Sequence, residues 1–118
     1  MLTISDSARV YLACGPTDMR KSIDGLAALV QHAFELDPFD ASLFVFCNRE
    51  RNKLKILYWD NNGFWLVYRR LEKGRFRWPN SSSEQTLTIT RRQLSWLLDG
   101  LKIEQKQAHR PVWAKVAA

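Results

Sequence analysis

The stretch Lys53–Pro79, KLKILYWDNNGFWLVYRRLEKGRFRWP, has the clearest structural pattern in this chain of 118 residues. Two runs rich in Ile, Val, Leu, Tyr and Trp flank the sequence DNNG at residues 60–63, which is typical of a β-hairpin. Asn62-Gly63 readily supplies the positive φ angles that a tight hairpin turn requires. A second turn at residues 72–74, EKG, predicts a short third strand after the hairpin.

The two-residue period of a strand sorts the hairpin side chains onto two faces, whether the turn has two or four residues. The first face holds Lys53, Lys55, Leu57, Trp59, Phe64, Leu66, Tyr68 and Arg70. The second holds Leu54, Ile56, Tyr58, Trp65, Val67, Arg69 and Leu71. We expect the second face to be the core face. The first face changes from aromatic at the turn to basic at the open end.

The segments around the hairpin predict the remaining strands and helices. They are a strand over 9–13, a helix over 19–34 begun by Thr17 or Asp18, a buried strand over 43–47, an edge strand over 87–89 and a helix after Thr90. Pro38 ends the first helix, and the sequence TRRQ at 90–93 matches a capping box for the second. We therefore predict an α+β fold: a small, mainly antiparallel sheet of about five or six strands, including the central hairpin, packed with two helices.

The length of the chain is that of one domain with one modest core. We predict a single domain over residues 1–101 and a flexible C-terminal tail over 102–118, which has no clear period. The small polar residues at 80–84 predict a mobile loop.

Positive charge is concentrated in the second part of the chain. Residues 1–48 carry three basic and six acidic side chains, whereas residues 49–118 carry fifteen and six, so their net charges are −3 and +9. Half of the 18 Lys and Arg residues lie between 49 and 78, together with half of the aromatic residues. A basic half favours a phosphate polyanion or an acidic protein partner, although a solvated surface can have the same composition. Nucleic acid is the favoured partner.

The nucleic-acid-binding residues that we predict are Lys53, Lys55, Arg70, Arg75, Arg77, Arg91 and Arg92. Either hairpin register places Arg70 opposite or diagonal to the two lysines, and a bound anion would relieve that repulsion. The alternative is that these long side chains splay into water. Arg91 and Arg92 begin the second helix, where they could hold a phosphate with the free N–H groups or form a solvated pair. The aromatic residues could stack on bases, but core packing explains them better.

Patterns for catalysis and metal binding are weak. His32 and His109 have no carboxylate or cysteine at metal-ligand spacing, and the serines at 81–83 lack the glycines of a nucleophile elbow. Cys14 and Cys47 lack CxxC or Cys/His spacing, which indicates reduced, structural thiols. We expect a protein that is not an enzyme, with no catalytic residue, no metal and no cofactor.

The N-terminal sequence MLTISDSARVYLACG lacks a basic region followed by a long apolar run. No apolar stretch in the chain approaches the length of a membrane span. We therefore expect a soluble, cytoplasmic protein with no membrane partner.

Three longer segments of the sequence are similar to those of a known protein family. They are VYLACGPTDMRKSIDGLAALV, DPFDASLFVFCNRERNKLKILYWDNNGFWLVYRRLEKGRFRWP and LTITRRQLSWLLDGL. In this order they resemble the TnpB accessory proteins of the bacterial insertion-sequence family numbered sixty-six, which are unrelated to the RNA-guided nuclease that shares the TnpB name. The resemblance covers about Arg9 to Leu101, and PTDMRKSIDGL and GRFRWP are its most specific parts.

The resemblance implies a mobile-element protein that accompanies a separate transposase carrying Asp-Asp-Glu catalytic residues. The family has no known catalytic residue set to carry over. One hypothesis is therefore an accessory factor that binds transposon-end DNA through the basic face of the hairpin. The other is an adapter that docks on the transposase through the aromatic end of the hairpin or through Trp113 of the tail. An independent nuclease is a distant third.

Overall fold

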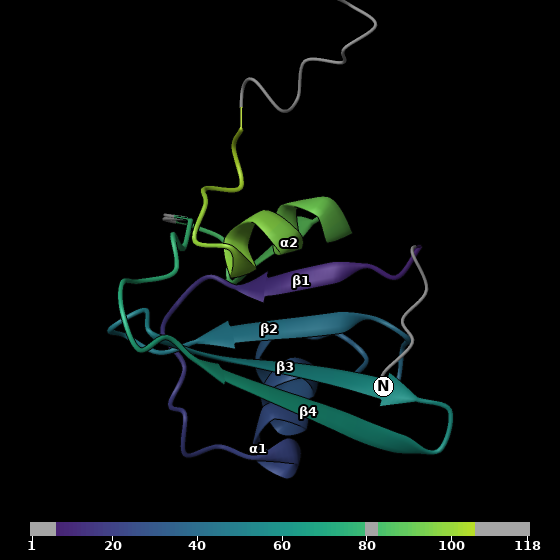
Figure 1. The fold of residues 1–118 in the computed structure, drawn as a ribbon. Coiled ribbons are helices and arrows are strands. Elements are labelled where there is room, and N and C mark those ends of the chain that lie inside the picture. Colours follow the sequence, from purple (N-terminus) through teal and green to yellow (C-terminus); the bar gives the residue numbers. More distant parts are fainter. Residues whose placement is uncertain (1–6, 80–82, 106–118) are drawn as a thin grey trace, which may run out of the picture.

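A computed structural model of the protein describes residues 7–79 and 83–105. These residues form a five-stranded sheet in the order β4-β3-β2-β1-β5. Figure 1 shows the run from β4 to β1. The strands are β1 (Val10–Ala13), β2 (Leu43–Cys47), β3 (Lys53–Asp60), β4 (Gly63–Arg70) and β5 (Thr86–Ile89). Only the β1–β2 pair is parallel, and the other pairs of neighbours are antiparallel. The predicted α+β class and mainly antiparallel sheet are confirmed.

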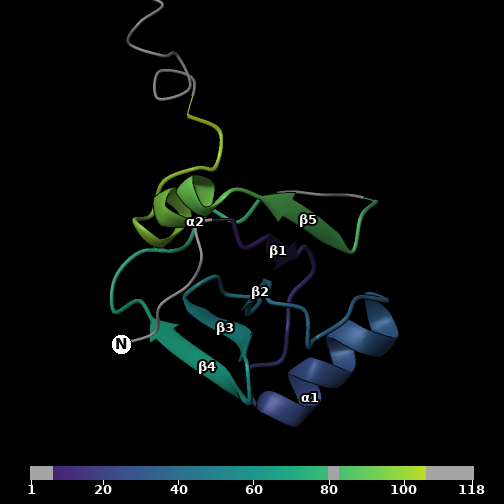
Figure 2. The ribbon, with the colours of Figure 1, turned by 90° about the vertical axis from the view of Figure 1, so that its right-hand side faces the viewer.

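The helices cover opposite faces of the sheet, as Figure 2 shows. Helix α1 (Ile23–Ala28) continues into a π-helical turn, η1 (Leu29–Ala33), and packs on β2 and β3. Helix α2 (Arg91–Leu98) packs on the other face, against β1 and β5 among others. Strand β2 lies in the middle and all of its residues are buried, which confirms the prediction for 43–47. A nearly continuous apolar run fits this position because both faces of the strand are covered.

The hairpin register confirms the sorting of side chains onto two faces, since Lys53 pairs with Arg70 and Leu57 with Leu66. The expected core face is confirmed on β3, where Leu54 and Tyr58 are buried, but it is not the only covered face and it does not extend to β4. Leu57, on the first face, is fully buried under α1, whereas Trp65 and Val67 on the second face are 47% and 40% exposed. The reason is that β3 lies inside the sheet while β4 is an edge strand.

The turn of the hairpin lies within the predicted sequence DNNG and has two residues. Asp60 pairs with Gly63, so Asn61 and Asn62 form a two-residue turn. The positive φ angle, 60°, is at Asn61, and Gly63 has none. Asn enters the left-handed region at low cost because its short polar side chain can bond locally. The positive φ angle that was expected from Asn62-Gly63 is therefore supplied by Asn61.

The predicted third strand does not form, because residues 71–79 contain no strand. A turn does occur at Gly74, which has a φ of 81°. Phe76 and Trp78 beyond it are buried in the α2-side core. The Phe76 N–H donates to the Arg51 carbonyl at 2.7 Å, and Trp78 Nε1 donates to the Ala13 carbonyl at 2.9 Å. The segment is thus held by its two aromatic side chains and by isolated bonds to a loop residue, Arg51, and to the last residue of β1, Ala13.

The first helix begins later than predicted. It starts at Ile23 with Ser22 at the N-cap, so neither Thr17 nor Asp18 caps it. The Asp18 carboxylate instead accepts from the backbone N–H of Arg20 at 2.9 Å and from its guanidinium. Residues 17–22 consequently form a loop. The helical part ends at Ala33, before Pro38.

The capping box at the start of α2 is confirmed. Thr90 Oγ1 accepts from the Gln93 N–H at 3.0 Å, and Gln93 Oε1 accepts from the Thr90 N–H at 2.9 Å. These bonds satisfy N–H groups that have no partner within the helix.

Replacing Thr90 by Ala is expected to lower the free energy of unfolding by about 1 kcal/mol, because the side-chain acceptor is lost. Urea unfolding followed by circular dichroism measures the change. Ser95→Ala is the control, since Ser95 is an exposed position of α2 and Ala has the higher helix propensity. Equal stabilities of Thr90→Ala and the unmodified protein would show that the box contributes nothing.

Two predicted regions fall wholly or partly outside the described residues. Residues 80–82 of the predicted loop and 106–118 of the predicted tail, with His109 and Trp113, belong there. The described part of the tail includes Ile103, which is buried against the α2-side core. Within 7–79 and 83–105, the helices are all too short to cross a membrane.

Candidate nucleic-acid interface

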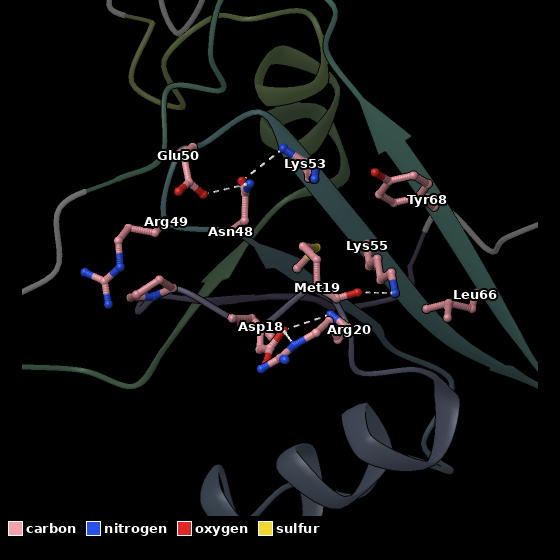
Figure 3. Close-up of a pocket in the computed structure, with 12 residues that line it drawn as sticks. Asp18, Met19, Arg20, Asn48, Arg49, Glu50, Lys53, Lys55, Leu66 and Tyr68 are labelled. Atoms are coloured by element: carbon pink, nitrogen blue, oxygen red, sulfur yellow. Dashed lines mark hydrogen bonds and ion pairs between the residues drawn. The ribbon is translucent and has the colours of Figure 1, made fainter.

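A groove of about 920 Å³ lies where the loop after β1, the turn after β2 and the open end of the hairpin meet (Figure 3). Its lining residues are Pro16, Thr17, Asp18, Met19, Arg20, Asn48, Arg49, Glu50, Lys53, Lys55, Leu66 and Tyr68. Four of these are basic and two are acidic, so the groove carries an excess of positive charge. The loop is tied to the sheet by the Thr17 N–H, which donates to the Cys47 carbonyl at 2.8 Å.

The turn after β2 is built by the buried side chain of Asn48. Its Oδ1 accepts from the backbone N–H groups of Asn52 and Lys53, both at 3.0 Å. Its Nδ2 donates to Asn52 Oδ1 at 2.8 Å and to Glu50 Oε1 at 3.2 Å. An Asn side chain that binds nearby backbone groups in this way replaces the bonds of a regular turn. The exposed Arg49 and Glu50 are therefore carried on a fixed turn.

Lys55 holds the loop after β1, which forms another wall of the groove. Its Nζ donates to the carbonyls of Met19 and Lys21, both at 2.8 Å, and so joins the loop to β3. The same ammonium group lies 5.8 Å from the ring centroid of Tyr68. Lys55 is thus a positioning residue for the groove, and its charge stays beside the cavity.

Arg20 and Asp18 form an ion pair at the rim of the groove, with Nη2 and Oδ2 2.7 Å apart. The hydrogen bonds from Arg20 lower the pKa of Asp18 from 3.8 to about 2, and those same contacts raise the pKa of Arg20. The Arg20 side chain remains 91% exposed, so its charge can still reach a ligand.

We expect Asp18 to titrate near pH 2 in the folded protein and to return toward its ordinary pKa when Arg20 is replaced by Gln. Because the folded pKa is depressed, the contribution of the pair to stability is complete above the ordinary pKa and is lost as pH falls through the folded value. NMR titration of the Asp18 carboxyl signal measures both midpoints. Identical midpoints in the two proteins would contradict the pairing.

Of the residues predicted on the hairpin, the structure brings Lys53 and Lys55 into the groove and places Arg70 beside it. Arg70 pairs with Lys53 across the ladder, and its Nε donates to Glu72 Oε2 at 2.7 Å. This contact raises the pKa of Arg70. Because Lys55 has two carbonyl partners and Arg70 a carboxylate, the argument from like-charge repulsion no longer requires a bound anion. DNA contact by these residues stays a prediction.

The other predicted residues lie on different surfaces. Arg75 and Arg77 are exposed on the segment after β4, and Arg77 lines a separate hollow with Lys102. Arg91 and Arg92 are on α2, where the Arg92 guanidinium lies 5.2 Å from the ring centroid of Trp96. They do not line the groove that contains Lys53 and Lys55.

The predicted set omitted two groove cations, Arg20 and Arg49. Arg20 falls within the helix that the sequence predicts over 19–34, and Arg49 falls between two predicted strands. The sequence PTDMRK at 16–21 could have indicated the position of Arg20, because an Asp two residues before an Arg permits the local ion pair that is observed. No local sequence pattern indicates that the two arginines line the same groove as Lys53.

Cys14 and Cys47 are both buried and are not joined in a disulfide. Burial raises the pKa of the Cys47 thiol, which disfavours the reactive thiolate. Among the described residues, His, Cys, Asp and Glu form no cluster of three or more that could hold a metal ion.

The fold and the groove define a small α+β protein whose concave surface has four basic and two acidic side chains among its lining residues. A family model described as "IS66 Orf2 like protein" matches residues 8–108. The chain therefore belongs to this family of insertion-sequence accessory proteins, and the resemblance seen in its sequence is confirmed. The family is not known for a catalytic activity.

Two similar proteins come from Sinorhizobium fredii (strain NBRC 101917 / NGR234). The uncharacterized protein y4hO is 42% identical over 101 residues, which cover 86% of this chain and 87% of the relative. The uncharacterized protein y4jC is 32% identical over 114 residues, which cover 94% and 97%. No solved structure matches the chain.

Proposed function

We propose that this protein is a non-catalytic, cytoplasmic accessory factor that supports transposition of an insertion sequence, a form of DNA recombination, by binding DNA through the groove. It acts together with the element-encoded transposase. The observation that carries the proposal is the convergence of Arg20, Arg49 and Lys53, from three separate segments, on one concave surface. Membership of an insertion-sequence family makes transposon-end DNA the natural polyanion.

The electrostatics of the groove favour phosphate. Asp18 is paired with Arg20, and Glu50 accepts a hydrogen bond from Asn48, and the four basic side chains of the lining still outnumber these two acids. Exposed Lys and Arg side chains contact phosphates and release condensed counterions from DNA. The groove thus provides three accessible cations, Arg20, Arg49 and Lys53, with Lys55 as a fixed charge behind them.

A salt titration tests the proposal. Binding of a transposon-end DNA and of a scrambled DNA is measured by fluorescence anisotropy at several salt concentrations. With three phosphate contacts, log K should fall against log salt with a slope of about −2 to −3. The ratio of the two affinities measures specificity. Absence of binding to either DNA at low salt would rule out the DNA-binding function.

A second candidate function, docking on the transposase, is favoured by an aromatic cluster at the turn end of the hairpin. The ring centroids of Phe39 and Trp59 are 5.0 Å apart, and those of Trp59 and Phe64 are 4.9 Å apart. Phe39 is 55% exposed, and exposed aromatic residues are frequent anchors of protein interfaces.

A pull-down with the purified transposase distinguishes the two functions. An adapter loses its partner when Phe39 is replaced by Ser and keeps it when the groove cations are neutralised. The opposite pattern, or no complex under any condition, counts against docking through this cluster.

A further inference from the structure

We propose that the groove accepts an unpaired nucleotide, stacked on Tyr68, so that the protein binds single-stranded DNA more tightly than a duplex of the same sequence. This inference rests on the proposed DNA-binding function and specifies the form of DNA that fits the site.

The first argument is the shape of the site. Its volume of about 920 Å³ lies in the range of about 300–1,000 Å³ that is typical of small-molecule sites. A nucleotide fits such a space if its base is splayed out. The bases of a duplex are stacked inside the helix, so a duplex can offer the concave surface only its backbone. Apolar lining by Leu66 and Met19 is of little use to a phosphate but favours a base.

The second argument is the position of Tyr68. Tyr68 lines the groove, and 50% of its surface is exposed. Its strand, β4, pairs with β3 along its whole length. In the hairpin register Tyr68 is opposite Lys55, whose ammonium lies near the ring and is fixed by two carbonyls. The ring therefore stands on a rigid support. An aromatic ring held in this way is a stacking platform for any base.

The third argument is the arrangement of charge around the ring. Lys53 lies on the same strand face as Lys55, and Arg20 and Arg49 line the groove from two other segments. If a base stacks on Tyr68, the phosphates of the same nucleotide lie in the space that these cations surround. Cations alternating with an aromatic platform are the usual arrangement in proteins that bind single strands without sequence readout.

Fluorescence anisotropy with a labelled oligonucleotide of about 12 nucleotides, alone and annealed to its complement, tests the proposal at one salt concentration. The single strand is expected to bind at least about tenfold more tightly than the duplex. Tyr68→Ala should weaken single-strand binding by about 5- to 150-fold, as the loss of one stacked base predicts, and weaken duplex binding by a clearly smaller factor. Tyr68→Phe keeps the ring and should keep the affinity.

Trp65→Ala is the matched control. Trp65 is an exposed aromatic residue of the same strand, but it lies on the opposite face and outside the groove. Its replacement should leave both affinities unchanged. Circular dichroism confirms that each variant is folded.

The outcomes separate this inference from the function on which it rests. Duplex binding that equals or exceeds single-strand binding, or a single-strand affinity unchanged by Tyr68→Ala, would overturn the inference and leave DNA binding in place. Absence of binding to both forms at low salt would overturn both.

Discussion

Replacing Phe46 by Ala is expected to lower the free energy of unfolding by about 3–5 kcal/mol. Phe46 is fully buried in the central strand β2, beneath α1 and η1. Its ring stacks on Phe34, with centroids 6.4 Å apart, and its backbone pairs with Lys55. The sheet and the helix are both anchored, so the cavity left by the ring cannot close without moving one of them. Typical domains have only about 5–15 kcal/mol of stability, so this loss is a large fraction of the total.

Urea unfolding of the Phe46→Ala protein measures the loss, with Phe39→Ala as the control. Phe39 is also aromatic and also touches two rings, but it is mostly exposed. Its replacement should cost less than about 1 kcal/mol, as is usual for surface positions. Similar losses for the two variants would contradict the placement of Phe46 in the core.

The parts of the fold that the sequence predicted are those with local signals. The hairpin follows from alternation around a turn, the buried strand β2 from a short apolar run, and the start of α2 from Thr90 and Gln93 in a capping box. Each of these patterns is contained within a few neighbouring residues. That is why the α+β class and the two faces of the hairpin could be predicted.

The errors arose where distant residues decide the local structure. The loop at 17–22 resembles the first turn of a helix, but Lys55, 34 residues from Lys21, takes two of its carbonyls. The segment after Gly74 has the composition of a strand, yet Phe76 finds its bond on Arg51 rather than on a neighbouring strand. The spacing of apolar residues and the secondary-structure propensity of a segment carry no information on such long-range contacts.

The groove was predictable only in part, for the same reason. Lys53 and Lys55 could be placed together because they share one face of one hairpin. Arg20 and Arg49 reach them only because β1, β2 and β3 are neighbours in the sheet, which brings the loop after β1 and the turn after β2 to the same end. That neighbourhood depends on the strand order, which the sequence pattern does not specify.

Neutralising Arg20, Arg49 and Lys53 together, each by Gln, is expected to weaken DNA binding by about 100-fold at low salt. Three contacts at about 1 kcal/mol each give this factor. The magnitude of the salt slope should fall by about 2 to 3, since each phosphate contact contributes about 0.7 to 0.9. Lys55 is left in place because it holds the loop to β3, and its removal would mix a loss of charge with a loss of structure. Anisotropy titrations at several salt concentrations measure both quantities.

A charge-matched variant decides whether the groove or merely the net charge of the protein binds DNA. Arg75→Gln, Arg77→Gln and Arg92→Gln remove the same three charges from surfaces outside the groove. If the groove is the interface, this variant keeps most of its affinity and its salt slope, because none of the three substituted side chains lines the groove. Equal losses in the two variants would mean that DNA is attracted by the overall charge, and a larger loss in the control would move the interface to the surfaces of Arg75, Arg77 and Arg92. Only a selective loss in the groove variant is consistent with a site made by three converging segments.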